Sequence, residues 1–217
     1  MNQPNNVLLH RGDLPEGRLG EPAIAIDTET LGLNPFRDRL CLVQLSSGDG
    51  HAELVQPARD YNAPELKRLL ADPSVLKIFH FARFDMAVLK HYFGVMPQPV
   101  YCTKVASKLA RTFTDRHGLK DLCRELLGIE LSKQQQSSDW GADRLTPEQL
   151  NYAASDVLHL HALREKLDAM LRRSYLSRRT TKLSDRNERD TDIQMELRRR
   201  RAHSGSLQCV ARRHCVW

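Results

Sequence analysis

Two acidic side chains stand at the end of a short apolar run. The run over residues 23–26 is followed directly by Asp27-Thr28-Glu29. If the run is a buried strand, alternation puts residues i and i+2 on one face, so both carboxylates point at the same place. Two ionised carboxylates held together repel each other unless a cation joins them. The pair therefore predicts a divalent-metal site with oxygen ligands, although a solvated strand end or a turn would also explain so short a motif.

A second acidic position follows another apolar run. Residues 75–79 predict a buried strand, and His80 leads from it to a helix that begins near Phe84 and carries Asp85 in its first turn. The N–H groups at a helix N-terminus stabilise a carboxylate. Asp85 is therefore explained either as a helix cap or as a further ligand of the metal site.

A third acidic position lies on a strongly signalled helix. Thr146, Pro147 and Gln149 predict a capping box with proline at the first helical position. Tyr152 and Asp156 follow four residues apart, so they share one face of this helix. Asp156 lies among small and apolar residues, where an unpaired charge is costly to bury. A solvated helix face with a core tyrosine is the alternative to a site role.

Together, these positions resemble the three motifs of the DEDD superfamily of 3′–5′ exonucleases, in the branch with tyrosine in the third motif. The motif residues are Asp27 and Glu29, then Phe84 and Asp85, then Tyr152 and Asp156. The resemblance covers residues from about 7 to 171 and is nearest to ribonuclease D and to the nanoRNase C group of small ribonuclease-D-like proteins. It implies an α/β fold, a ribonuclease H-like mixed β-sheet flanked by α-helices.

The same resemblance implies roles for five site residues and a cofactor of two divalent ions, Mg²⁺ or Mn²⁺. Asp27 would bridge the two ions, and Glu29 and Asp156 would hold the ion on the side of the nucleophile. Asp85 would hold the second ion, largely through water. Tyr152 would orient the attacking water, because a phenol with a pKa near 10 is a poor general base.

Neighbours of the motifs are candidates for substrate contact. In this superfamily an apolar residue after the first motif wedges between the last two bases, which makes Leu31 and Leu33 candidates for this role. The alternative is that these loop leucines pack into the core. His80 could donate to the scissile phosphate, and Phe84 could stack on a base or pack in the core. The remaining candidates are Thr28 and Gln44.

The nanoRNase C resemblance implies hydrolysis of short RNAs, dinucleotides above all, to nucleoside 5′-monophosphates. It also implies a homo-oligomeric ring, such as an octamer, if the C-terminus is intact. Residues 1–171 hold 20 Lys/Arg against 22 Asp/Glu, and so slightly acidic a body favours short substrates, because long nucleic acids usually need an extended cationic track. The alternatives are ribonuclease D-type trimming of longer RNA, DNA 3′–5′ exonuclease activity, and an inactive nucleic-acid-binding module.

The elements that must position these residues predict a mixed sheet covered by helices. An antiparallel start of two neighbouring hairpins is expected, after a polar leading segment over residues 1–20 that caps an edge near residues 10–14. A Gln-rich stretch over residues 132–140 predicts a mobile loop. The expected strands are 23–27, 40–45, 52–55, 75–79 and one near 100, and the expected helices are 64–70, 84–93, 104–110, 118–127 and 146–171.

Length and composition favour one folded domain over residues 1–171, which the resemblance implies is an exonuclease domain, and an Arg-rich tail over residues 172–217. No stretch approaches the roughly 20 apolar residues of a membrane helix, and the N-terminus lacks the pattern of a signal peptide. The five scattered cysteines predict neither a disulfide framework nor a zinc site. A cytoplasmic location is therefore expected. The tail, with 13 Lys/Arg against 5 Asp/Glu, is explained either as a disordered basic arm or as a frameshifted end.

Overall fold

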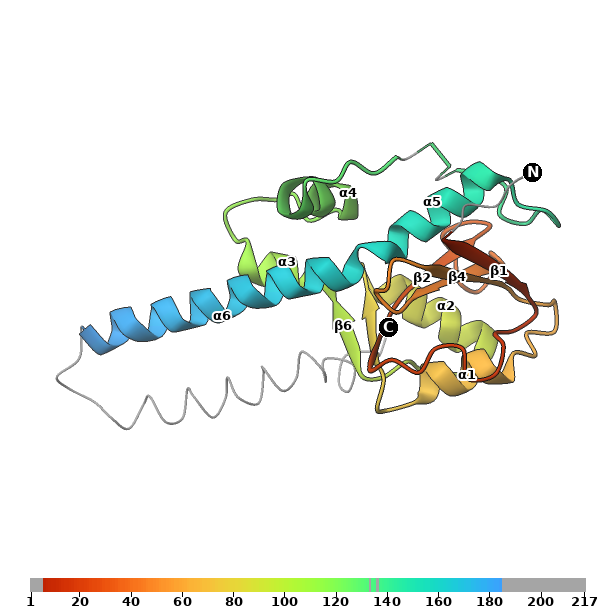
Figure 1. Cartoon of the computed structure of the whole chain (residues 1–217), viewed down its shortest axis with the longest axis horizontal. Coiled ribbons are helices and arrows are strands. Elements are labelled where there is room, and N and C mark those ends of the chain that lie inside the picture. Colours follow the sequence, from red (N-terminus) through yellow and green to blue (C-terminus); the bar gives the residue numbers. More distant parts are fainter. Residues whose placement is uncertain (1–5, 133, 136, 185–217) are drawn as a thin grey trace.

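The computed structural model describes residues 6–132, 134–135 and 137–184, which form one mixed β-sheet with helices on both faces (Figure 1). The six strands lie in the order β1-β4-β3-β2-β5-β6. This arrangement confirms the predicted α/β class. The strands are β1 (Val7–Arg11), β2 (Ala23–Thr30), β3 (Leu40–Ser46), β4 (Ala52–Gln56), β5 (Leu76–Phe79) and β6 (Val100–Cys102).

The pairing of the strands confirms the antiparallel start and adds an edge strand. β3 pairs antiparallel with both β2 and β4, whereas β2, β5 and β6 run parallel to one another. β1 pairs in parallel with β4, so the prediction of a mere leading segment was wrong. β1 is half exposed and carries His10 and Arg11, which leaves it without the apolar run that marks a buried strand, so its pairing depends on β4.

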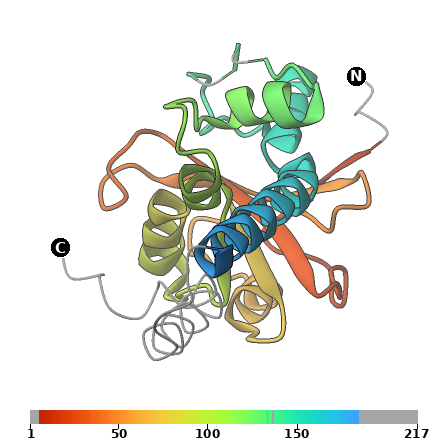
Figure 2. The same ribbon diagram turned by 90° about the vertical axis from the view of Figure 1, so that its left-hand side faces the viewer.

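The helices cover the sheet in two layers, which Figures 1 and 2 show from two directions. α1 and α2 pack on one face of the sheet, and α3, α4, α5 and α6 pack on the other. A short π-helical turn, Cys123–Leu127, follows α4. The helices are α1 (Pro64–Ala71), α2 (Arg83–Phe93), α3 (Thr103–Ala110), α4 (Leu119–Leu122), α5 (Pro147–Leu158) and α6 (Leu160–Ser184).

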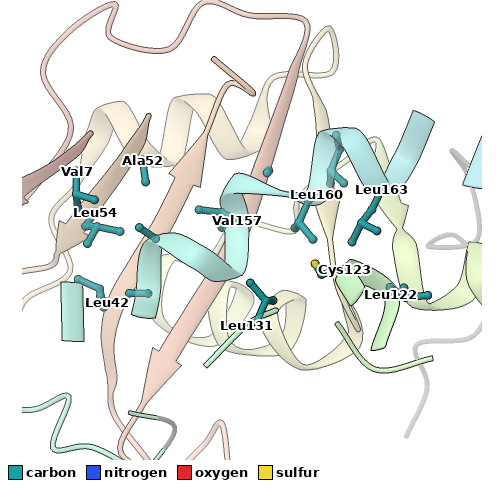
Figure 3. Packing of buried hydrophobic residues seen from close by; sticks show 14 of the residues in the cluster. Val7, Leu42, Ala52, Leu54, Leu122, Cys123, Leu131, Val157, Leu160 and Leu163 are labelled. Atoms are coloured by element: carbon teal, nitrogen blue, oxygen red, sulfur yellow. The ribbon is translucent and has the colours of Figure 1, made fainter. Parts of the chain in front are cut away.

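Alternation along β2 divides its side chains between the two cores. Ile24 and Ile26 are buried against α1 and α2, whereas Ala25 belongs to the core beneath α5 and α6. Figure 3 shows this second core, to which Leu42 and Leu54 contribute from the sheet and Val157, Leu160 and Leu163 from α5 and α6. The same alternation directs Asp27 and Glu29 toward α5, and Thr28 toward α2.

The last predicted helix is two helices. The capping box at Thr146 and Gln149 is present, but α5 ends at Leu158 and the chain changes direction before α6 (Figure 1). Leu160 and Leu163 remain fully buried after this break. α6 also continues beyond the predicted end at Leu171, and residues 172–184 contain neither glycine nor proline to stop it.

Two predictions, one about the C-terminal tail and one about the location of the protein, are not decided by the fold. Residues 185–217 lie outside the described part, so a basic arm and a frameshifted end both stay predictions for the tail. Among the described residues, no helix combines the length and apolarity needed to cross a membrane. The cytoplasmic location likewise stays a prediction.

Candidate active site

Three carboxylates meet between β2 and α5. Asp27 and Glu29 come from the C-terminal half of β2, where a register shift after Glu29 ends regular pairing with β3. Asp156 comes from α5, whose small buried residues Ala153 and Ala154 let the helix approach the sheet closely. One oxygen from each of the three carboxylates lies within 4.8 Å of the others. Such a cluster of hard oxygen donors fits a divalent cation.

The fourth acid reaches the site from the other side of β2. Asp85 lies in the first turn of α2 and is only 3% exposed. The Thr28 hydroxyl donates a hydrogen bond to an Asp85 carboxylate oxygen at 2.7 Å. Thr28 is itself 6% exposed, so in this structure it holds an acid of the site and has little surface left for the substrate contact predicted for it.

Burial makes all four acids hold protons more tightly, and repulsion by neighbouring acids adds to this effect at Asp27, Glu29 and Asp85. Burial, followed by the charges of Asp85, Asp156 and Glu29, raises the pKa of Asp27 well above its usual range. Burial first, then Asp156 and Asp85, raises the pKa of Glu29 to about 9. Burial also raises the pKa of Asp85 and of Asp156 to about 7 in each case. A cation that neutralises the cluster would reverse these shifts, which is how a metal site behaves.

Tyr152 lies one helical turn before Asp156 on α5 and is half-buried. Burial, followed by the charges of Asp156, Glu29 and Asp27, raises the pKa of Tyr152 above its usual value. The hydroxyl therefore stays protonated at neutral pH and can donate a hydrogen bond to a water or to an oxygen of a substrate. This fits the orienting role implied by the resemblance better than a general base.

His80 and Phe84 flank the second motif in different environments. His80 Nδ1 lies 2.9 Å from the Thr103 hydroxyl, and burial, followed by Lys104, lowers the pKa of His80 to about 4. The imidazole is thus neutral at pH 7 and can donate only one N–H. Phe84 packs against the core beneath α1 and α2, in agreement with the core-packing alternative.

Phe81 is a further candidate for substrate contact, which the sequence did not predict. It is 52% exposed at the end of β5 and has a positive φ of 67°, which is unusual for a bulky residue. The Lys104 ammonium lies 4.2 Å from the centre of its ring. The signal in the sequence was an aromatic residue beside His80, just before α2, but nothing in the sequence indicated its exposure.

The loop after β2 presents the two leucines outward. Leu31 is 53% exposed and Leu33 is 88% exposed. The Thr30 hydroxyl donates to the Gly32 carbonyl, and a side chain at Gly32 would collide with Asp38. The loop thus holds two apolar side chains in solvent shortly after Glu29, as a base wedge would require.

Gln44 lies directly opposite Asp27 in the pairing of β2 with β3. Opposed residues of an antiparallel pair share a face, so Gln44 lies under α5 on the same side as Asp27. It is fully buried, and neither its amide nitrogen nor its oxygen has a hydrogen-bond partner within the described structure. A side chain without exposed surface does not support the substrate contact predicted from the sequence.

Comparison of the sequence with known proteins gives a family and a relative. A 3′–5′ exonuclease family matches residues 13–172. A ribonuclease D from Granulibacter bethesdensis is 34% identical over 203 residues, which cover 91% of this chain and 51% of that protein. The chain therefore spans about half the length of this curated relative.

Solved structures extend the likeness to the fold. Brucella melitensis NrnC is 58% identical, with a TM-score of 0.76 over 80% of this chain and 85% of that chain. NrnC has also been solved with bound Mg²⁺ and bound to pGG, each at 56% identity and a TM-score of 0.75. Escherichia coli RNase D is described as an exoribonuclease involved in structured RNA processing. It is 32% identical, with a TM-score of 0.63 over 71% of this chain and 40% of that chain. These likenesses confirm the predicted exonuclease fold.

Proposed function

The chain belongs to the 3′–5′ exonuclease family, and from this membership we propose that it hydrolyses short RNAs, dinucleotides above all, to nucleoside 5′-monophosphates. The cluster of Asp27, Glu29 and Asp156 carries the proposal, because these acids occupy the first and third exonuclease motifs. The similarity to NrnC, solved with pGG, supports a short substrate. Ribonuclease D-type trimming of longer RNA remains the second candidate, since the curated relative is a ribonuclease D.

We propose Mg²⁺ or Mn²⁺ as the cofactor. Asp27, Glu29 and Asp156 would hold one ion, and Asp27 and Asp85 a second, because buried acids with raised pKa values favour a bound cation. When bound, such ions generate a hydroxide nucleophile and stabilise the leaving oxygen. The NrnC structure with Mg²⁺ supports this choice of metal.

The chain's own residues supply orientation around that centre. Tyr152, which stays protonated, donates its hydroxyl hydrogen to hold the attacking water in line with the scissile phosphate. Thr28 fixes the carboxylate of Asp85 through its hydrogen bond. Leu31, exposed on the loop after β2, separates the last two bases so that the terminal nucleotide enters the acidic cluster.

A substrate-length assay tests the proposed function. The full chain with Mg²⁺ or Mn²⁺ is incubated in parallel with a labelled diribonucleotide, a longer RNA and a DNA duplex, and the Asp27→Ala variant serves as the control. We expect rapid loss of the dinucleotide, slow shortening of the longer RNA, and no reaction with the variant. A surviving dinucleotide beside shortened RNA would favour ribonuclease D-type trimming, and no hydrolysis of any substrate would favour an inactive binding module.

We propose further that the chain assembles with copies of itself. Three apolar side chains are exposed on α3 and just after it, namely Val105 at 45%, Leu109 at 54% and Phe113 at 77%. Val105 and Leu109 are four residues apart and so share one face of the helix. Exposed apolar stripes of this kind often mark subunit contacts. Light scattering that gives the mass of a monomer at micromolar concentration would overturn this proposal.

A further inference from the structure

A short segment before α5, residues 138–143, is tied to four other parts of the fold, and we call it the strap. It falls at the end of the stretch predicted to be mobile, but the structure gives it many fixed contacts. Four backbone carbonyls of the strap each accept a hydrogen bond from a side chain in a different part of the fold. The donors are Arg11 to Asp143 at 2.8 Å, Gln56 to Ala142 at 2.9 Å, Arg39 to Gly141 at 3.1 Å and Gln149 to Asp139 at 3.0 Å.

These anchors connect the strap both to the sheet and to α5. Arg11 and Gln56 come from the neighbouring strands β1 and β4, whereas Gln149 belongs to α5 itself. The Gln149 amide also donates to the Ser138 hydroxyl at 2.7 Å. Since Gln149 is also the capping-box residue of α5, the position of the strap is fixed relative to the helix that carries the third motif.

The strap inserts one large side chain against that helix. Trp140 is 2% exposed, and its ring centre lies 6.0 Å from that of Tyr152, with 38° between the ring planes. Contact between rings at this spacing is favourable and limits the directions that the tyrosine ring can take. The Trp140 indole N–H is buried and has no partner within the described structure, so ring packing rather than hydrogen bonding accounts for its place.

The strap also touches the loop that carries the exposed leucines. A Cβ atom added at Gly141 would lie 3.0 Å from a methyl carbon of Leu31 and 3.0 Å from the Arg39 guanidinium. Only glycine fits here without displacing one of these side chains. The strap therefore lies against both Tyr152 and Leu31, to which the proposed function assigns the attacking water and the last two bases.

We propose that Trp140 is a positioning residue of the exonuclease reaction, which holds the Tyr152 ring so that its hydroxyl faces the attacking water. The inference rests on the proposed function of Tyr152. The phenol has a single hydroxyl at the end of a rigid ring, so a small rotation of the ring moves the hydroxyl away from its target. A displacement of about 1 Å at a reacting group can cost about 100-fold in rate.

A double-mutant cycle tests this proposal in the full-length chain. Trp140→Leu removes the aromatic contact, Trp140→Phe keeps a ring, and each is combined with Tyr152→Phe. We expect Trp140→Leu to lower kcat by about 10- to 100-fold with little change in KM, and Trp140→Phe to recover most of the loss. In the Tyr152→Phe background the same leucine substitution should have almost no further effect, because the hydroxyl that it misplaces is already absent.

A purely structural role for Trp140 predicts different results. An equal loss in both backgrounds, or a loss confined to KM, would overturn the proposal. If Trp140→Leu does not fold, as judged by circular dichroism, Gln56→Leu replaces it. That variant removes one anchor of the strap, and we expect a smaller loss of kcat that again disappears with Tyr152→Phe.

A second measurement separates this inference from the proposed activity. In protein labelled with 3-fluorotyrosine, the ¹⁹F resonance missing from Tyr152→Phe identifies Tyr152. We expect Trp140→Leu to move that resonance toward the free amino-acid position, whether or not the dinucleotide is hydrolysed. An unchanged resonance would refute the positioning role, whereas a moved resonance in a protein without nuclease activity would refute only the proposed function.

Discussion

The burial of the Asp156 carboxylate predicts how Asp156→Asn changes stability. Asp156 has a pKa raised by burial from 3.8 to about 7. A group with a raised folded-state pKa contributes stability that is present below its unfolded pKa and lost as the pH rises through its folded pKa. In the metal-free protein this loss therefore develops between about pH 4 and about pH 7. Asparagine has a similar shape and no charge, so the variant does not lose stability in this pH range.

The size of the effect follows from the same shift. One pKa unit is worth about 1.4 kcal/mol, so the full change corresponds to about 4 kcal/mol. Asp156 retains some exposed surface, and water solvates part of its charge, so we expect about 2 kcal/mol. For a chain of this size that is about 4–8 °C in Tm. The variant should therefore be the more stable protein at neutral to basic pH, and we expect it to lack the proposed nuclease activity.

Thermal unfolding in EDTA, followed across this pH range, measures the difference. The stability gap between the variant and the original chain should widen with rising pH and level off above about pH 7. Added Mg²⁺ should narrow the gap, because the three-carboxylate cluster binds the ion only when complete. Glu130→Gln, which neutralises an exposed carboxylate in a surface ion pair, is the control and should show no such pH dependence. A gap of constant size at all pH values would refute the argument from the buried charge of Asp156.

Two further substitutions probe the support of the acids. Thr28→Val removes the hydrogen bond to Asp85, so we expect Mg²⁺ titrations to show weaker binding. We expect kcat to fall by about 10-fold, which is typical of groups that orient metal ligands. The control is Thr30→Val, which removes a hydrogen bond to a backbone carbonyl instead and should leave Mg²⁺ affinity unchanged. Gln44→Leu replaces a buried amide that has no hydrogen-bond partner among the described residues, so the metal-free chain should unfold at the same temperature or higher. A loss above about 1 kcal/mol would mean that the amide is hydrogen-bonded in solution.

The sequence was sufficient where the signal is local. The alternation of β2 predicts that Asp27 and Glu29 share a face, and the spacing of Tyr152 and Asp156 predicts one helix face, because both rules depend only on backbone geometry. The capping box at Thr146 was likewise readable, since its two hydrogen bonds join residues three apart. Order along the chain then sufficed for the resemblance to an exonuclease.

Tertiary structure decided everything that depends on a distant partner. The strand β1 exists because β4 pairs with it, and the orientation of Thr28 toward Asp85 depends on α2 packing against the opposite face of β2. Gln44 seemed a substrate contact but is buried by α5. Trp140 gave no signal at all within a polar stretch, because three of the four anchors of its segment, Arg11, Arg39 and Gln56, come from parts of the chain far away in the sequence. Local periodicity in the sequence placed the acids of each motif on one face, and the resemblance to an exonuclease gave them their predicted roles. Only the packing of distant segments determined what holds each of them in place.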